Sequence, residues 1–599
     1  MSCQGLQVVI LIAVLAAALS ADDHLLPLHD DGAAGNVTTD TMVAGAGAGA
    51  QGTLCIQQLA RDGCVPLAGQ AVCDACLEKH SADLLAAGCN TSFVVGYCQG
   101  SAQRSVRQFL GLRYAEPPTG GRRFLPAILA PLNESQMSRN NSYGPDCIQN
   151  GRKAFKGEDC LFLNVWTPAQ LDGHQLAPLL PVMVWIHGGG FHLGSGRDYH
   201  GSVLAASQNV VVVTLNYRLG ALGFFTSEEL LRSNTSRPRS NGGLNGLNDM
   251  VVALQWLHNN LHRFGGARDR ITVFGQSAGA ISICTLLVSP RAQGLFQRAI
   301  IESGPCTGPW TIGTEDEALA LSLIFSKGRS LEALRKLDAM TAFTQGSMVL
   351  PGVDHWILPA AEGQPLQRYH QAIAAGRTLN AQSVMLGGNS FDGLETWIIP
   401  AGELGLARYE SDMLTSFPSN SSAVERLYPL SRFGGSRNGA LTQSTGDCDV
   451  VCPNYELAEL VTQTEATAFV YYFDYGPVCN DRALQRNVST APITHGWASH
   501  AAELFWAFGW PRKCFTNSSE LALTRAMQDY WGSFAREGVP SLTIAGDNSQ
   551  NWTAFSRSLR NTMVLDLNWR MEHGWKSHDC ASLRAAAGRG NETWPCLLA

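Results

Sequence analysis

Charge is scarce in this sequence. Asp, Glu, Lys and Arg make up 16% of the 599 residues, and the net charge of −7 comes without a basic patch or a long run of like charges. Because proteins that bind nucleic acid carry such a patch, we expect no nucleic-acid partner. The hydrophobic fraction of 45% instead predicts one large core, and the length leaves room for an accessory module.

Long apolar runs are scarce as well. The run Val8–Leu19 is shorter than the roughly 20 residues that a helix needs to cross a bilayer, and no later stretch could span one. Ala18 and Ser20 frame a cleavage point before Ala21, so we interpret residues 1–20 as a secretory signal peptide, although no Lys or Arg precedes the run. An N-terminal membrane anchor is the alternative interpretation.

Cysteine, by contrast, is abundant. Removing Cys3 with the signal peptide takes the count from 17 to 16, an even number that suits disulfides in an oxidising compartment. Asn-x-Ser/Thr sequons are spread along the chain, at Asn36, Asn90, Asn133, Asn140, Asn234, Asn420, Asn487, Asn517, Asn551 and Asn591. Together these features predict a secreted, extracellular glycoprotein.

The N-terminal part divides into two segments. Residues 21–52 are rich in Gly and Ala and are expected to form a flexible linker. Residues 53–100 are predicted to be a Cys-rich module, because so short a segment needs disulfides to fold. Its Cys residues are Cys55, Cys64, Cys73, Cys76, Cys89 and Cys98, and the sequence does not choose among their many pairings. Cys73 and Cys76 have the spacing of zinc or redox sites, but no second ligand pair or thioredoxin-like pattern accompanies them. A helical module that could hold an extracellular ligand is the simpler interpretation.

Residues 101–599 have the pattern of an α/β domain. Apolar runs alternate with helix-like stretches, and several runs are continuous enough to predict a mostly parallel sheet buried on both faces. The expected strands are Leu161–Trp166, Pro181–Ile186, Val210–Leu215, Ile271–Phe274, Ala299–Glu302, Ser383–Leu386 and Ala468–Phe473. A helix is expected over Asp249–Phe264, and structural ion pairs are expected between Arg218 and Asp249 and between Arg123 and Glu158.

A candidate nucleophile lies between one of these strands and an apolar helix. Gly275-Gln-Ser-Ala-Gly279 matches the G-x-S-x-G nucleophile elbow, whose sharp turn leaves room only for Gly on either side of the serine. The pentapeptide alone is a weak signal, because Gly and Ser are common. Its strand–turn–helix context makes Ser277 the candidate nucleophile.

A candidate oxyanion hole follows an earlier strand. Val182–Ile186 runs into His187-Gly-Gly-Gly-Phe191, and successive glycines leave the backbone free to turn N–H groups inward. We expect Gly189 and Gly190 to donate such groups together with Ala278, the residue after the nucleophile. His187 is expected to be a structural neighbour and not a catalytic base.

Five segments resemble the type-B carboxylesterase/cholinesterase family. They are Phe109–Pro118, Glu158–Trp166, Asn216–Gly220, Gly243–Asp249 and Gly275–Gly279. The resemblance covers roughly residues 108–575 and leaves out the Cys-rich module. It implies an α/β-hydrolase fold and a triad in the chain order Ser, acid, His, with no metal and no cofactor.

The resemblance also indicates the acid and the base. Asp392 takes the acid position after the strand that begins at Ser383, where relatives carry an acidic residue followed by Glu-Gly. Glu395 is a weaker alternative, and Asp354 resembles a structural turn of the family. For the base we favour His500, because a Glu three residues later and an aromatic-rich run ending in Phe-Gly reproduce the family spacing. His495, which is followed by Gly as the family base often is, remains the alternative.

Two departures from the sequence pattern of the family narrow the range of substrates that we expect. Gln276 stands where relatives usually carry Glu, which removes a negative charge beside the serine. Cys147 and Cys160 resemble the family's first disulfide, but the loop between them lacks the Trp that stacks on choline in cholinesterases. A general carboxylesterase or lipase, acting on small-molecule or lipid esters, is therefore favoured over a cholinesterase. Trp310 resembles an acyl-pocket residue, although a core position is nearly as compatible.

The alternative function is a catalytically silent, cholinesterase-like binding or adhesion protein, since the family includes such members. We favour the enzyme because Ser277, Asp392 and His500 are all present with an intact glycine loop. Of the remaining cysteines, Cys284 is expected to be a buried free thiol, with Cys306 as a second unpaired Cys. Cys580 and Cys596 are placed to pair near the tail. The sequence does not indicate an oligomeric state.

Overall fold

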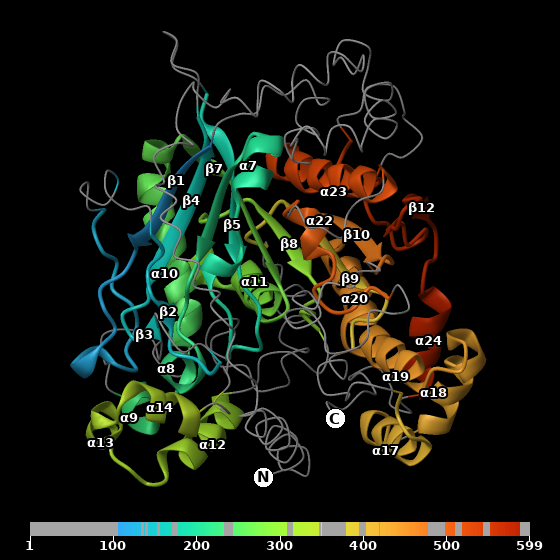
Figure 1. The fold of residues 1–599 in the computed structure, drawn as a ribbon, viewed down its shortest axis with the longest axis horizontal. Helices are drawn as coiled ribbons and strands as arrows, with labels where there is room; N and C mark the ends of the chain where they lie inside the picture. Colours follow the sequence, from blue (N-terminus) through green and yellow to red (C-terminus); the bar gives the residue numbers. More distant parts are fainter. Residues whose placement is uncertain are drawn as a thin grey trace, which may run out of the picture.

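The computed structural model is built on a ten-stranded sheet in the order β1-β4-β6-β5-β7-β8-β9-β10-β11-β12, which runs through the middle of the molecule (Figure 1). The strands from β6 to β11 pair in parallel, whereas β1, β4 and β12 pair antiparallel at the two ends. The structure describes residues 106–132, 137, 142–151, 156–169, 178–232, 244–307, 315–346, 349, 379–393, 403–418, 420–476, 497–509, 518–542 and 552–586.

The sheet contains all seven strands expected from the apolar runs. The strands are β1 (Val106–Arg113), β4 (Phe162–Pro168), β5 (Leu180–Ile186), β6 (Val211–Leu215), β7 (Gly266–Gln276), β8 (Arg298–Glu302), β9 (Ser383–Asn389), β10 (Thr467–Phe473), β11 (Thr562–Leu565) and β12 (Arg570–Glu572). A separate small sheet pairs β2 (Asp146–Cys147) with β3 (Lys156–Gly157). The predicted mostly parallel α/β-hydrolase sheet is therefore confirmed.

Helices cover both faces of the large sheet. They are α7 (Ser202–Gln208), α8 (Gly220–Phe224), α9 (Glu228–Arg232), α10 (Asn245–Asn260), α11 (Ala278–Val288), α12 (Glu315–Ser326), α13 (Leu331–Lys336), α14 (Ala339–Gln345), α17 (Leu406–Ser416), α18 (Ser421–Leu427), α19 (Arg437–Gly446), α20 (Cys452–Val461), α22 (Leu504–Ala507), α23 (Ser518–Glu537) and α24 (Ser577–Ala586). A π-helical turn, Asp447–Val451, joins α19 to α20. Among the described residues, no helix is both long enough and apolar enough to cross a membrane.

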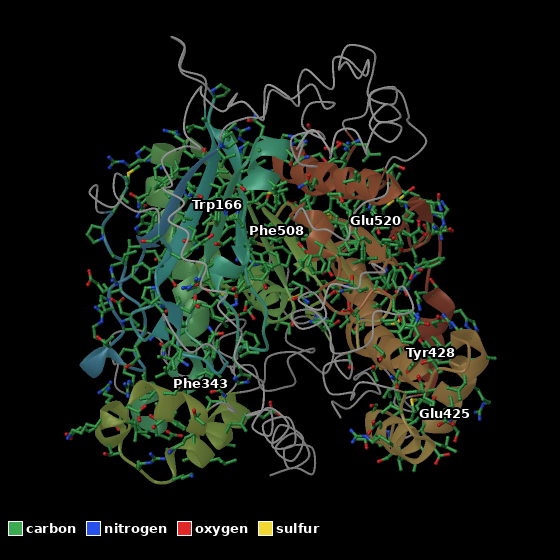
Figure 2. The ribbon with its side chains drawn as sticks, viewed as in Figure 1. Trp166, Phe343, Glu425, Tyr428, Phe508 and Glu520 are labelled. Carbon is green, nitrogen blue, oxygen red and sulfur yellow. A yellow bond between two sulfur atoms is a disulfide. The ribbon has the colours of Figure 1, made fainter. Side chains whose placement is uncertain are left out.

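The strand sequences explain why both faces are covered. Successive side chains of a strand point to opposite faces. In β5, Val184 and Ile186 therefore join the core beneath α10, α11 and α20, while Met183 and Trp185 join the core beneath α7, α22 and α23. Figure 2 shows Trp166 and Phe508 inside the packed molecule, and both belong to the second core. Because every residue of β5 after Leu180 is buried, its sequence reads as a continuous apolar run and not as an alternation.

The predicted helix at Asp249–Phe264 begins earlier than expected. Helix α10 starts at Asn245, and a 3₁₀ turn completes its end at Leu261–Phe264. Gly246 looks like a loop residue in the sequence, but a Cβ there would lie 2.4 Å from the Phe224 ring. The glycine is thus required by close packing within the first helical turn.

Both predicted ion pairs are confirmed. Arg218 contacts Asp249 at 2.7 Å, with both side chains buried, and Arg123 contacts Glu158 at 2.5 Å. Arg218 also donates to the carbonyl of Leu125, which joins the loop that carries Leu125 to α10 through Asp249. Burial raises the pKa of Asp249, while Arg218 opposes that shift. Removing one partner of such a buried ion pair leaves the other charge unpaired and would lower the free energy of unfolding by about 3–5 kcal/mol. The pairs therefore hold the loops around the sheet in place.

Two cysteine predictions are wrong. Cys284 is not a free thiol but forms a disulfide with Cys306, and Cys580 pairs with Cys452 and not with Cys596. The turn after β8 passes directly over the first turn of α11, where a Cβ on Gly304 would lie 2.4 Å from Ala280. This close approach brings together two cysteines that the sequence separates by 22 residues. Cys596 lies outside the described residues.

Candidate active site

The turn after β7 has the geometry of a nucleophile elbow. Ser277 has φ 56° and ψ −126°, a strained combination for a residue with a side chain. Its N–H donates to the carbonyl of Glu302 on β8 at 2.9 Å. Cβ atoms on Gly275 and Gly279 would lie 2.6 and 2.0 Å from the carbonyl oxygen of Ile186, so neither position accepts a side chain. The strain at Ser277 is thus imposed by two neighbouring strands and by the helix that follows.

The glycine loop lies directly against this elbow. Ile186 at the end of β5 pairs with Gly275 at the end of β7, so the two strands deliver their loops to the same edge of the sheet. A Cβ on Gly188 would lie 3.0 Å from the Cβ of Ser277. Gly189 and Gly190 have φ values of 106° and 59°, which glycine adopts freely. Within the described chain, the N–H groups of Gly189, Gly190 and Ala278 find no backbone acceptor.

Aromatic stacking fixes the start of the glycine loop. The ring of His187 stacks on Tyr217 with centroids 4.3 Å apart, and the Tyr217 hydroxyl donates to the carbonyl of His187 at 2.8 Å. His187 is buried, and its Nδ1 contacts the carbonyl of Gly188 at 2.8 Å. These contacts give His187 a structural position in the loop.

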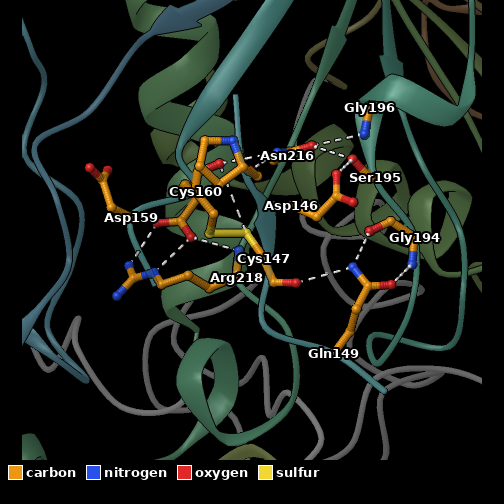
Figure 3. Close-up of a disulfide and its surroundings, with 12 residues drawn as sticks. Asp146, Cys147, Gln149, Asp159, Cys160, Gly194, Ser195, Gly196, Asn216 and Arg218 are labelled. Carbon is orange, nitrogen blue, oxygen red and sulfur yellow. Dashed lines mark hydrogen bonds and ion pairs between the residues drawn. A yellow bond between two sulfur atoms is a disulfide. The ribbon is translucent and has the colours of Figure 1, made fainter. Parts of the chain in front are cut away.

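A disulfide-bonded segment fixes the end of the same loop (Figure 3). Cys147 is bonded to Cys160, the pairing that the family resemblance implies. Between them, the Gln149 amide both donates to the carbonyl of Gly194 at 2.9 Å and accepts from its N–H at 3.0 Å. Asn216 donates to the carbonyl of Cys160 at 3.2 Å. Contacts within the protein therefore hold the chain on both sides of the three glycines.

The predicted acid and base are in contact. His500 Nδ1 lies 2.5 Å from Asp392 Oδ1, and the two side chains are 2% and 0% exposed. The other carboxylate oxygen, Oδ2, accepts the backbone N–H of Asn389 at 2.7 Å. With Asp392 accepting at Nδ1, the neutral ring carries its proton there and leaves Nε2 as an acceptor.

The loop that carries Asp392 is tightly packed. The N–H of Phe391 donates to the carbonyl of Ala498 at 2.9 Å, which joins this loop to the segment that carries His500. The end of α19 closes over it, since a Cβ on Gly446 would lie 2.7 Å from the backbone nitrogen of Asp392. Asn389 connects the two segments a second time, because its amide donates to the carbonyl of Ser499 and to the carboxylate of Glu503.

Two buried carboxyl groups lie behind the site. Glu302 accepts a hydrogen bond from the Trp531 indole at 3.0 Å, and Glu503 accepts one from Asn389 at 2.6 Å. Burial raises the pKa of both to about 8, and for Glu503 the negative charges of Glu302 and Asp392 add to the shift. Sequence reasoning used Glu503 only as a spacing marker and did not assign Glu302 or Asn389 any role.

Gln276 contacts the imidazole directly. Its Nε2 lies 2.9 Å from His500 Nε2, on the side of the ring opposite Asp392. Because Gln276 precedes Ser277, this contact places Nε2 of the ring at the elbow. The sequence marked Gln276 as unusual but gave no sign of this contact.

The structure thus brings Asp392, His500 and the turn carrying Ser277 to one edge of the sheet, beside the glycine loop. The alternatives His495 and Glu395, like Trp310 and Asp354, lie outside the described residues. Where the chain is described, no group of three or more His, Cys, Asp or Glu side chains is arranged to hold a metal ion.

The sheet order, with an elbow at the end of β7 and an acid after β9, defines an α/β-hydrolase. The chain belongs to the carboxylesterase family, whose model, described as "Carboxylesterase family", matches residues 88–583. Among its relatives is a protein named cholinesterase from Mus musculus, 31% identical over 77% of this chain and 80% of that protein. Carboxylesterase 1D from Rattus norvegicus is also 31% identical, over 77% of this chain and 85% of its own.

Solved structures give the same result. A structure titled PNB esterase superimposes with a TM-score of 0.62 at 28% identity, covering 80% of this chain and 96% of its own. Fold and family together make the chain a carboxylic ester hydrolase by class.

Proposed function

We propose that the protein is a secreted serine carboxylesterase or lipase in which Ser277, His500 and Asp392 form the catalytic triad. The observation that carries the proposal is the 2.5 Å contact between His500 and Asp392, with the other ring nitrogen of His500 at the elbow. That arrangement leaves a base of defined tautomer beside a strained serine, as nucleophilic acyl transfer requires.

The chemistry then takes two steps. His500 Nε2 removes the proton of the Ser277 hydroxyl, and Oγ attacks the carbonyl carbon of the ester. The C–O bond to the alcohol breaks, and the imidazolium returns the proton to the departing oxygen. Water next attacks the acyl-enzyme, with His500 again acting as base, and the carboxylic acid leaves. Asp392 stabilises the imidazolium throughout and keeps the proton on Nδ1.

The negative charge that develops on the carbonyl oxygen needs preorganised donors. The N–H groups of Gly189, Gly190 and Ala278 supply them in this proposal, because the loop and the elbow adjoin and the three groups lack backbone acceptors among the described residues. Removing one such donor typically lowers turnover on the order of 10²-fold or more.

Neutral esters are the proposed substrates. The Cys147–Cys160 loop contains no Trp to stack on a quaternary ammonium group, and Gln276 provides no carboxylate beside the serine. Relatives named cholinesterase and carboxylesterase are equally similar to this chain, so the assignment rests on these residues.

An extracellular location fits the proposal. The predicted signal peptide, linker and Cys-rich module lie outside the described residues, and each remains part of the proposal. Three disulfides within the described domain and an exposed sequon at Asn420 are compatible with passage through an oxidising compartment.

Hydrolysis of chromogenic acyl esters, from acetyl to palmitoyl, tests the function. We expect turnover by the wild type, background rates for Ser277→Ala and His500→Ala, and near-normal rates for His495→Ala. The acyl-length profile separates esterase from lipase, and a choline ester should react no faster than a neutral ester with the same acyl group. A folded wild type that hydrolyses nothing, or an active Ser277→Ala variant, would contradict the proposal.

A further inference from the structure

Asn389 contacts both the proposed acid and the segment that carries the proposed base. It is the last residue of β9 and is fully buried. Its backbone N–H donates to Asp392 Oδ2 at 2.7 Å. Its side-chain Nδ2 donates to the carbonyl of Ser499 at 2.7 Å and to the carboxyl group of Glu503 at 2.6 Å. The backbone of one residue therefore holds the acid, while its side chain holds the chain on both sides of His500.

The sheet and the two hydrogen bonds define the orientation of the Asn389 side chain. Its backbone pairs with Phe473 on β10, in the interior of the sheet. Because a carbonyl oxygen can only accept, the atom that contacts Ser499 is the NH₂ group, and this assigns the amide. An Asn side chain has two torsions, and two hydrogen bonds hold them. The spacing between acid and base is therefore set within one rigidly placed residue.

The turn that carries the proposed base is strained. The N–H of Ala502 donates to the carbonyl of Ser499 at 3.0 Å, which closes a four-residue turn. Ala501, the third residue of this turn, has φ 68°, a left-handed conformation that glycine adopts freely and that is unfavourable for other residues. Such a conformation persists only where the surrounding structure holds it. Asn389 donates to the same carbonyl that closes the turn, and so helps to hold it.

We infer that Asn389 is a positioning residue whose side chain holds the strained turn, so that His500 stays beside Asp392 and Ser277. The inference rests on the proposed function and extends it to a residue outside the triad. A displacement of about 1 Å in a catalytic group can lower the rate on the order of 10²-fold. A small relaxation of the turn is therefore sufficient to slow the transfer of the serine proton.

Phe391 also joins the two segments. Its N–H donates to the carbonyl of Ala498 at 2.9 Å, its backbone forms a bridge with Ser499, and its ring stacks on Trp497 with centroids 4.6 Å apart. These are backbone and ring contacts of another residue. A substitution at Asn389 leaves these groups unchanged, as it does its own N–H, so it isolates the contribution of the amide side chain.

The test is steady-state hydrolysis of a neutral ester by Asn389→Leu, which keeps the approximate size of the side chain without its donors. We expect kcat to fall on the order of 10²-fold, because the base is displaced. KM should change by less than about threefold, because the change concerns the transition state and not the binding of the ester. Thermal unfolding confirms that each variant is folded at the assay temperature.

Asn454 on α20 provides a matched control. It is 1% exposed, and its Nδ2 donates to the carbonyl of Gly387 on β9 at 2.9 Å. This hydrogen bond supports the same strand but involves neither the acid nor the turn. Asn454→Leu should therefore lower Tm as Asn389→Leu does, while its kcat stays within about threefold of the wild type.

Relief of the strain provides a second readout. Because glycine adopts a positive φ freely, Ala501→Gly makes the turn less dependent on outside support. We expect this variant alone to have a near-normal kcat. Combined with Asn389→Leu, it should raise kcat roughly fivefold above that of Asn389→Leu. If Asn389→Leu does not fold, Asn389→Ser, which is smaller and polar, replaces it in every comparison.

Equal losses of kcat in Asn389→Leu and Asn454→Leu would overturn the inference, since general support of the strand would then explain both. A double variant no more active than Asn389→Leu would also overturn it, because the side chain would not act through the turn. Both results leave the triad intact. An active Ser277→Ala variant would contradict the proposed function itself.

Discussion

His500 is held at both ring nitrogens, by Asp392 on one side and by Gln276 on the other. Asp392 Oδ1 lies 2.5 Å from Nδ1, and the amide nitrogen of Gln276 lies 2.9 Å from Nε2. In the proposed mechanism, the contact with Asp392 keeps the ring in one orientation while it takes and returns the serine proton.

Asp392→Asn tests the orienting contact. The amide keeps the size of the side chain but offers a donor as well as an acceptor, so the ring can adopt the wrong tautomer. We expect kcat to fall by about 10⁴-fold with a Tm close to that of the wild type. Steady-state kinetics with thermal unfolding measures both, and a loss of less than about tenfold would exclude Asp392 as the triad acid.

Single residues of the site differ in how well the sequence predicts them. Ser277 and the glycine loop follow from local chemistry, since a sharp turn demands glycines at fixed offsets. Asp392 and His500 needed the family spacing, because nothing local distinguishes them from a solvated Asp or His. The contact between Gln276 and His500 joins residues 224 positions apart and leaves no trace in the sequence.

At the scale of elements, the glycine loop depends on a segment that never touches the substrate in our proposal. Gln149 forms two hydrogen bonds with Gly194, and the Cys147–Cys160 disulfide holds Gln149 in place. The loop is thus preorganised from outside, which is what electrostatic stabilisation of a transition state requires.

Gln149→Met tests this support. Methionine has a similar length but cannot form the pair of hydrogen bonds, each worth about 1 kcal/mol. We expect kcat to fall by roughly tenfold while KM changes little, because the loss concerns the transition state. Gln463→Met, at an exposed position, is the control. A raised KM with an unchanged kcat would mean that the segment serves substrate binding instead.

The sequence predicted the interior elements better than the outer ones. Strands such as β5 and β6 are continuous apolar runs because both faces are buried, and that signal is strong. β1, β11 and β12 were not among the expected strands, since β1 is partly exposed and the other two are short. The start of α10 was missed because Gly246 resembles a loop residue and its packing partner, Phe224, is distant in the sequence.

At the scale of the whole molecule, the two buried carboxyl groups of Glu302 and Glu503 make the free energy of unfolding depend on pH. Glu302 and Glu503 have pKa values raised to about 8 by burial, whereas an exposed Glu titrates near 4.3. Between these values the folded protein binds more protons than the unfolded chain, so the free energy of unfolding falls as the pH rises.

Glu302→Gln should weaken this dependence. The amide retains an acceptor for Trp531 but cannot ionise, so the decline in Tm from pH 5 to pH 8 should be smaller than in the wild type by roughly 3 °C or more. Calorimetry across that range measures the difference. Glu410→Gln, at an exposed position on α17, should follow the wild type, and a parallel decline in all three proteins would contradict the assignment.

Which cysteines form a disulfide also depends on the fold of the whole molecule. The predictions for Cys284 and Cys580 were wrong for this reason. Partners such as Cys284 and Cys306 meet only because the turn after β8 crosses α11, a consequence of strand order that no local pattern records.

The bond between Cys452 and Cys580 closes a ring of chain whose ends are 128 positions apart in the sequence. A protease that cut once inside this ring would produce two polypeptides that still travel as one particle. Such damage would be invisible in size-exclusion chromatography and in a non-reducing gel, and only a reductant would reveal it. In the extracellular location that we propose, the bond would thereby keep α24, the last helix of the described residues, attached after the first cut.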